Sequence, residues 1–121
     1  MIREQKFTVV HRDEMERDGA WSLARRSLGL TAFGLNVVDV EPGGGIPEHT
    51  EVARDQEEVF VVLSGSPTIV IDGRPMPLSE GCFVRLDPEP TRYVRNDRTE
   101  PARVLIASAP RTSGYEPLAW A

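Results

Sequence analysis

The sequence predicts an all-β protein. Its 121 residues include ten glycines and ten prolines, and these break the chain into short segments rich in Val, Ile and Leu. That pattern is typical of many short strands joined by tight turns. Between two such segments lies the pair Asp72-Gly73, which favours a two-residue type I′ turn because that turn needs positive φ at both central residues. At least one antiparallel hairpin is therefore expected.

Six segments are the strongest strand candidates, and turn residues separate each from the next. In chain order they are Gly34–Val40, Glu58–Leu63, Thr68–Ile71, Phe83–Leu86, Arg92–Arg95 and Val104–Ala107.

The segment Glu58–Leu63 is the most informative strand. Alternation places Glu58, Phe60 and Val62 on one face, and the three residues interleaved with them on the other. Both faces are largely apolar, so we expect the strand to be buried. A carboxylate on a buried strand costs free energy unless it is paired or bound, which makes Glu58 a candidate functional residue.

We expect one domain, with a core at about residues 28–110, an N-terminal arm at 1–27 and a tail at 111–121. The segment Asp13–Ala20 is either a short helix or a polar loop. Arg25-Arg26 is the only basic doublet, and we interpret it as a solvated strand edge. The tail ends near Trp120, which we expect to pack on the sheets or on a neighbouring subunit.

Composition argues against several classes of partner. The formal charge is -5, and the 14 basic residues are scattered among 19 acids, whereas nucleic-acid binding depends on clustered Lys and Arg. No apolar run approaches the roughly 20 residues of a membrane-spanning helix, and an anionic membrane surface is disfavoured for the same reason as nucleic acid. The single cysteine, Cys82, cannot form an intrachain disulfide. We interpret it as a small buried hydrophobe and expect a cytoplasmic protein.

Two spacing patterns suggest a functional site. In the first, Gly43 is followed after five residues by His49, and Glu58 is followed after six residues by Gly65, in the phrase EEVFVVLSG. In the second, the same kind of frame runs through Gly81, Asp87, Glu89, Arg92 and Asn96. Residues two apart on a strand share a face, so histidines and carboxylates at such spacings can converge on one ligand.

These patterns resemble the two motifs of the cupin superfamily, over roughly residues 28–110. The first motif matches in its spacing at each end, but Glu51 stands at its second histidine and the gap to Glu58 is longer than in the family. In the second motif, three of the five identities differ. The resemblance implies a double-stranded β-helix, the jelly-roll barrel, and a homodimer joined through sheet edges and terminal arms.

The resemblance also implies a metal site of three histidines and one glutamate, for Mn, Fe, Ni or Zn. Here only His49 and Glu58 keep the identity of a ligand; Glu51 is a possible substitute, and the last histidine position is Arg92. Arginine offers no lone pair to a metal. Our first hypothesis is therefore a site without metal, in which Arg92 neutralises Glu58 or Glu51 by a planar bidentate salt bridge.

The competing hypothesis is a three-ligand site of His49, Glu51 and Glu58 that holds a divalent metal, with His11 as a possible fourth ligand. A third interpretation leaves His49 as an ordinary surface histidine.

The preferred function is binding of a small polar molecule inside the barrel through Arg92, Glu58, His49 and Phe60, without a complete metal site. The alternative is a metal-dependent enzyme, such as a dioxygenase, isomerase or lyase. A structural subunit without a ligand is the third possibility. Two other strand residues receive no role, because Tyr93 should face away from Arg92 and an exposed position is expected for Arg85.

Overall fold

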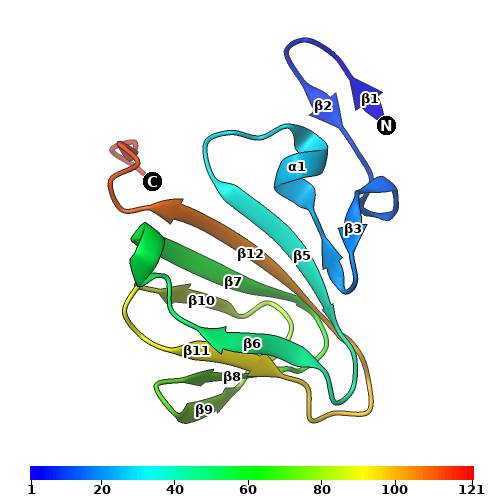
Figure 1. The fold of residues 1–121 in the computed structure, drawn as a ribbon, viewed down its shortest axis with the longest axis vertical. Coiled ribbons are helices and arrows are strands. Elements are labelled where there is room, and N and C mark those ends of the chain that lie inside the picture. The colour runs from blue at the N-terminus through cyan, green and yellow to red at the C-terminus, as the bar shows by residue number, and fades with distance from the viewer.

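The computed structural model describes residues 1–121, and it confirms the all-β class. Two antiparallel sheets face each other, and a small hairpin stands apart from them at the N-terminal end (Figure 1). The six-stranded sheet has the order β10-β7-β12-β5-β4-β3, and the four-stranded sheet has the order β6-β11-β8-β9. Neither order closes on itself, so the predicted closed barrel stays a prediction.

The strands are β1 (Ile2–Arg3), β2 (Thr8–Val9), β3 (Arg17–Asp18), β4 (Trp21–Ser22), β5 (Gly34–Val40), β6 (Gly45–His49), β7 (Gln56–Ser64), β8 (Thr68–Ile71), β9 (Arg74–Pro77), β10 (Phe83–Leu86), β11 (Arg92–Arg95) and β12 (Ala102–Pro110). The helices are the 3-10 turns η1 (Arg12–Glu14) and η2 (Val52–Arg54) and the short α1 (Ala24–Leu28). No helix has the length and apolar character that crossing a bilayer requires.

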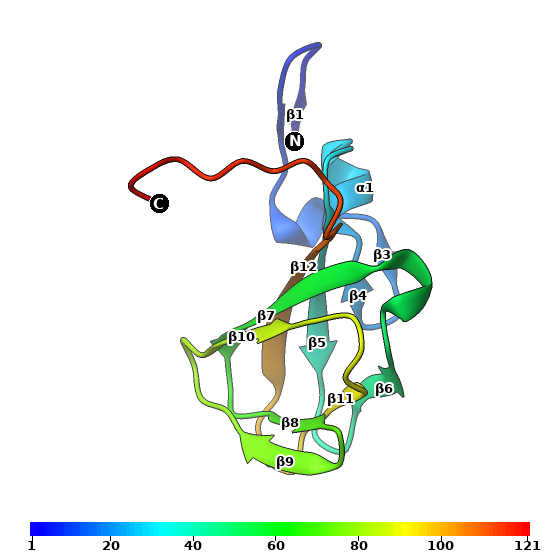
Figure 2. The same ribbon diagram turned by 90° about the vertical axis from the view of Figure 1, so that its left-hand side faces the viewer.

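An apolar core lies between the two sheets. Figure 2 shows the two sheets from the side. Strands of both sheets contribute to it, and its buried members are Val38, Val40, Ile46, Phe60, Ile69, Leu86, Val94, Ala102, Val104 and Ile106. Burial of such side chains is the main favourable term in folding. On β7 the face of Phe60 is buried, but Leu63 on the other face is exposed. The expectation that β7 is buried on both faces is therefore wrong.

The inner face of the six-stranded sheet changes from apolar to polar along its length. On β5, Asn36 shares a face with Val38, and on β12 Ser108 shares a face with Ile106, because residues two apart point to the same side. On β7 the same alternation places Gln56 and Glu58 in line with the buried core residues. Ser108 is the register partner of Glu58. These polar positions gather at one end of the core.

The Asp72-Gly73 turn is confirmed. Asp72 has φ 49° and Gly73 has φ 78°, as a type I′ turn requires, and the turn joins β8 to β9 in an antiparallel pair. The Asp72 carboxylate also accepts a hydrogen bond from the backbone N–H of Thr91 (2.9 Å). This hydrogen bond joins the turn to the segment that precedes β11.

The flanking segments differ from expectation in two places. Arg25 and Arg26 lie in α1 rather than on a strand edge, because Gly29 provides the left-handed residue that ends a helix there. Trp120 is 84% exposed, so it does not pack on the sheets of its own chain. The open choice for Asp13–Ala20 resolves into η1 followed by β3.

Candidate ligand and metal site

Three side chains with metal-ligating atoms converge at the polar end of the core. His49 is the last residue of β6, Glu51 precedes η2, and Glu58 lies on β7. One donor atom from each residue lies within 4.8 Å of the others. His49 Nε2 is 3.3 Å from a carboxylate oxygen of Glu51 and 3.6 Å from Oε1 of Glu58. The His49/Glu51/Glu58 cluster therefore joins the two facing sheets.

A backbone contact orients the His49 ring. Its Nδ1 lies 2.9 Å from the carbonyl oxygen of Pro47. A carbonyl can only accept a hydrogen bond, so Nδ1 carries the proton. This leaves Nε2 facing the two carboxylates, either as a neutral nitrogen with a free lone pair or as the second N–H of an imidazolium. A hydrogen bond from the distal ring nitrogen to a carbonyl is the usual support for a metal-ligating histidine.

Arg92 completes the site from β11, where it is the register partner of His49. Its side chain is 0% exposed, and Nη1 lies 3.6 Å from Oε1 of Glu58. Nη2 donates to the carbonyl oxygen of Asp87. The expected ion pair with Glu58 is therefore present, but it is not bidentate. The buried atoms Arg92 Nε, Arg92 Nη1 and Glu58 Oε1 have no hydrogen-bond partner, and that leaves capacity for a further polar group.

Burial raises the pKa of the Glu58 carboxyl above its ordinary value, and the negative charge of Glu51 raises it further. The charges of His49 and Arg92 act in the opposite direction. Ionising both carboxyl groups of the site therefore costs free energy, because like charges at short range and low solvation disfavour ionisation. A bound cation or hydrogen-bond donor would relieve this cost.

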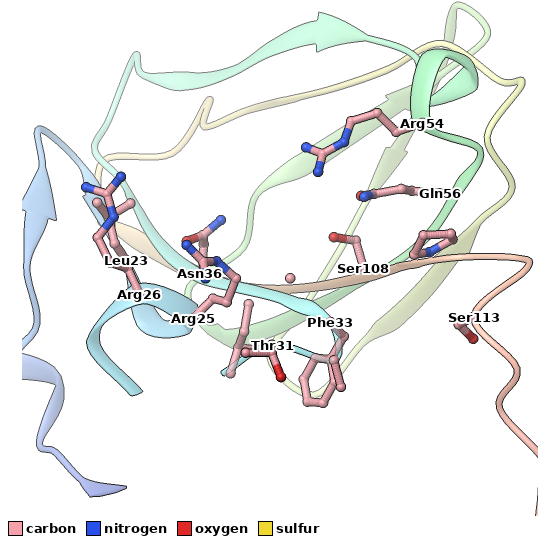
Figure 3. A pocket seen from close by; sticks show the side chains of 14 residues that line it. Leu23, Arg25, Arg26, Thr31, Phe33, Asn36, Arg54, Gln56, Ser108 and Ser113 are labelled. Carbon is pink, nitrogen blue, oxygen red and sulfur yellow. The ribbon is translucent and has the colours of Figure 1, made fainter. Parts of the chain in front are cut away.

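A cavity of about 210 Å³ opens beside the cluster. Its walls are mostly polar: Trp21, Asn36, His49, Glu51, Arg54, Gln56, Glu58, Ile106 and Ser108. We call it the inner cavity. A larger one of about 580 Å³, the outer cavity, shares Asn36, Arg54, Gln56 and Ser108 with it. Figure 3 shows Arg54 and Gln56 reaching into the outer cavity from one side, with Asn36 and Arg25 on the other.

Other predicted site residues lie elsewhere. Phe60 is buried in the apolar core and does not line the inner cavity. His11 is not a fourth ligand: its exposed ring accepts a hydrogen bond from the backbone N–H of Asp13 at the start of η1. Cys82 is half-buried rather than fully buried. Arg85 is exposed, as expected, because its strand turns that face to solvent.

Sequence reasoning missed the apolar lining residues Trp21 and Ile106 and four polar residues of the inner cavity, namely Asn36, Arg54, Gln56 and Ser108. A signal was present for three of the four polar residues, because each lies two positions from a buried residue on a strand. Arg54 carried no such signal, since it lies on a turn.

A model of the cupin domain matches residues 36–108, which include both motifs and every strand from β6 to β11. The chain belongs to the cupin family. No curated protein matches this cupin. A cupin protein from Bacteroides fragilis has a similar structure, with a TM-score of 0.80 and 22% identity, over 97% of this chain and 94% of that chain.

Two further solved structures carry different functional names. A sugar phosphate isomerase of the cupin superfamily from Silicibacter pomeroyi gives a TM-score of 0.64 at 23% identity, over 75% of this chain and 60% of that chain. A predicted oxalate decarboxylase from Thermotoga maritima gives 0.58 at 16% identity, over 62% of this chain and 64% of that chain. At these identities the likeness shows the fold alone, because one fold hosts many chemistries.

Proposed function

We propose that this cupin binds a small polar molecule in the inner cavity, beside the His49/Glu51/Glu58 cluster. The observation that carries the proposal is the buried Oε1 of Glu58, which has no hydrogen-bond partner although it faces His49 and Arg92. Buried polar atoms in native proteins almost always have a partner, and an exception at a cavity indicates a place for a ligand. A volume of about 210 Å³ suits only a small molecule.

The charges of the site support a ligand with hydroxyl groups or other hydrogen-bond donors. Two carboxylates and one imidazole line the inner cavity, and the guanidinium of Arg92 lies outside the cavity wall, 3.6 Å from Oε1 of Glu58. If His49 is protonated, the positive and negative charges of these four groups balance. The site then needs no metal to be neutral, and Arg92 acts in place of the histidine found at this motif position in the family.

A second candidate function is that of a metal-dependent enzyme, as for cupin dioxygenases, isomerases or lyases. The observation in its favour is the convergence of three donor atoms within 4.8 Å, with the His49 ring already oriented through Nδ1. His49, Glu51 and Glu58 fit a divalent Mn, Fe, Ni or Zn ion by donor type. Such an ion supplies a Lewis acid. Arg92 would then stabilise the negative charge of Glu58 without binding the metal itself.

Metal content separates the two candidates. We would measure it by inductively coupled plasma mass spectrometry before and after loading the purified protein with Mn, Fe, Ni and Zn. Near-stoichiometric metal that is lost in His49→Ala supports the enzyme. The matched control is His11→Ala, which removes the only other histidine of the chain and an exposed one. Absence of retained metal under every loading condition supports the metal-free site.

Ligand binding itself is tested by thermal shift with a panel of small polyols, sugars and hydroxy acids. A compound that raises the melting temperature of the wild type but not of Glu58→Gln supports the inner cavity as the site. If every stabilising compound acts equally on both proteins, the proposed binding site is wrong.

Three broader predictions accompany this proposal. We propose that residues 1–121 form one jelly-roll domain, that two copies associate through exposed sheet edges, and that the protein acts in the cytoplasm. The unpaired outer edges of β9 and β10 support association, and the single cysteine supports a reducing compartment. Light scattering at several concentrations tests the dimer.

A further inference from the structure

The outer cavity has an unusual charge for this protein. Arg25, Arg26 and Arg54 line it, and none of its 14 lining residues is an aspartate or glutamate. The chain as a whole carries a net charge of -5. Three arginines gathered around one cavity therefore form a local positive field within an acidic protein, and a concave surface concentrates such a field.

The three arginines differ in whether a nearby carboxylate neutralises their positive charge. Arg26 lies 3.0 Å from a carboxylate oxygen of Glu16. Arg25 donates only to the carbonyl oxygen of Leu30, at 3.3 Å, so its positive charge is not neutralised. Arg54 is exposed and forms neither a hydrogen bond nor an ion pair through its side chain.

The acid next to Arg54 in the sequence, Asp55, is already paired with another arginine. Asp55 adopts a left-handed conformation, with φ 50°, and its carboxylate is bound by Arg111 at 2.6 Å. Arg111 also holds Glu89, at 2.9 Å. These contacts leave Arg54 as a free guanidinium directed into the cavity (Figure 3).

The outer cavity adjoins the inner one. Asn36, Arg54, Gln56 and Ser108 line both. Beside these shared residues, the outer cavity has the guanidinium groups of Arg25 and Arg26, and the inner cavity has the carboxylates of Glu51 and Glu58. The outer cavity therefore favours an anionic group, whereas the inner cavity favours a cation or a hydrogen-bond donor.

We propose that the outer cavity binds the anionic end, a phosphate or a carboxylate, of the same small molecule whose polar end reaches His49. This rests on the proposed function, and it narrows the ligand to a small anion with a neutral hydroxylated part. Arg54 and Arg25 are the anion-binding residues. The guanidinium group suits this role because its planar set of N–H donors matches both phosphate and carboxylate oxygens, while Asn36, Gln56 and Ser108 supply neutral hydrogen bonds along the way.

The test uses two small anions that carry no hydroxylated part. Inorganic phosphate and malonate are titrated separately into the 15N-labelled protein, and binding is followed by amide chemical shifts at residues of η2, β5 and β12. The variants are Arg54→Gln and, as a matched control, Arg85→Gln, which removes an exposed arginine from β10. We expect saturable binding of at least one anion, weakened about tenfold by Arg54→Gln, as loss of one charge-assisted contact predicts, and unchanged in Arg85→Gln. The tighter of the two anions identifies the anionic group.

The proposal is overturned if neither anion binds saturably, or if Arg54→Gln binds as tightly as the wild type. His49→Ala separates this failure from that of the proposed function, because phosphate and malonate do not need His49. Anion binding that depends on Arg54 but not on His49 supports the outer site even where no ligand of the inner cavity is found. A panel compound that needs Glu58 but not Arg54 overturns the anion site and leaves the proposed function standing.

Discussion

Arg92 is the residue at which this cupin departs most clearly from the family pattern. The spacing of the second motif predicts a histidine at this position, and the Arg92 side chain is 0% exposed and lies 3.6 Å from Oε1 of Glu58. Two charges buried this close are mutually dependent, since removal of one leaves the other without compensation in a weakly solvated site. Sequence reasoning anticipated the pairing from the motif frame alone. It did not anticipate the geometry, because the carbonyl of Asp87 takes up the other end of the guanidinium.

We predict that Arg92→Leu lowers the free energy of unfolding by about 3 kcal/mol, because Glu58 then loses its buried counter-charge. Urea denaturation followed by circular dichroism measures the change. Arg85→Leu, at an exposed position of β10, is the control and should change the free energy by less than about 0.5 kcal/mol.

The double variant Arg92→Leu with Glu58→Gln should recover part of the loss, because it removes both charges of the buried pair. If Arg92→Leu alone is as stable as the wild type, Arg92 does not compensate Glu58, and the metal-free interpretation of the site loses its main support.

At the scale of elements, sequence reasoning gave the correct bounds for four strands and too short a range for β7 and β12. The predicted bounds of β5, β8, β10 and β11 agree with the structure, because runs of Val, Ile and Leu between turn residues identify buried strands directly. β6 was missed and β9 was inferred only from its turn. Both lie at the edges of the four-stranded sheet and contain proline, which edge strands tolerate because one row of their backbone groups is unpaired. Pairing with a neighbour, rather than local preference, makes these segments strands.

Gly45 illustrates how such an edge strand positions the site. It begins β6 opposite Arg95, four residues before His49, which lies opposite Arg92 on the same partner strand. A Cβ at Gly45 would lie 2.2 Å from the carbonyl oxygen of Val94. That is a clash with backbone, so only movement of β6 away from β11 can relieve it.

We predict that Gly45→Ala lowers the free energy of unfolding by about 2 kcal/mol, within the usual cost of overpacking, and shifts the His49 ring signals in 1H–13C NMR spectra. Gly73→Ala is the control: its positive φ of 78° imposes strain, but its Cβ would meet nothing within 4 Å. This control should lose stability and leave the His49 signals unchanged. Unaltered His49 signals in Gly45→Ala would show that the close approach does not position the ring.

At the scale of the whole molecule, the second half of the N-terminal arm is part of the six-stranded sheet, whereas its β1–β2 hairpin stands apart. Its strands β3 and β4 extend the six-stranded sheet beyond β5, and α1 packs beside that strand (Figure 1). The sequence did not predict this, because the contacts join residues far apart in the chain and the arm lacks a long apolar pattern. The outer cavity depends on the arrangement, since α1 contributes Arg25 and Arg26 to its wall. Motif analysis could therefore identify the candidate metal-ligating residues, but it could not identify the arginines of the proposed anion site.

One carboxylate fastens the arm to the sheet. Asp39 on β5 accepts hydrogen bonds from Arg103 at 2.9 Å, Arg17 at 3.2 Å and Arg12 at 3.3 Å. Burial by itself raises the pKa of Asp39, but the hydrogen bonds from Arg103 and Arg17 and the charges of the neighbouring arginines outweigh burial, so the pKa lies below its ordinary value of 3.8. Folding therefore favours the ionised form of this group.

The lowered pKa of Asp39 determines how the free energy of unfolding changes with pH. A carboxyl whose pKa is lower in the folded state contributes stability that is fully present above its unfolded pKa and is lost as the pH falls through the folded pKa. We predict that Asp39→Asn lowers the free energy of unfolding by about 2 kcal/mol at neutral pH, the scale of charged hydrogen bonds, and that the difference from wild type shrinks below about pH 4. Urea denaturation between about pH 7 and pH 3 measures it, with Asp18→Asn, an exposed aspartate without an ion pair, as the control whose curve should parallel the wild type. A difference that stays constant down to pH 3 would mean that Asp39 stabilises the arm by shape rather than by charge, and that the arm and the arginines it carries are held to the sheet by other contacts.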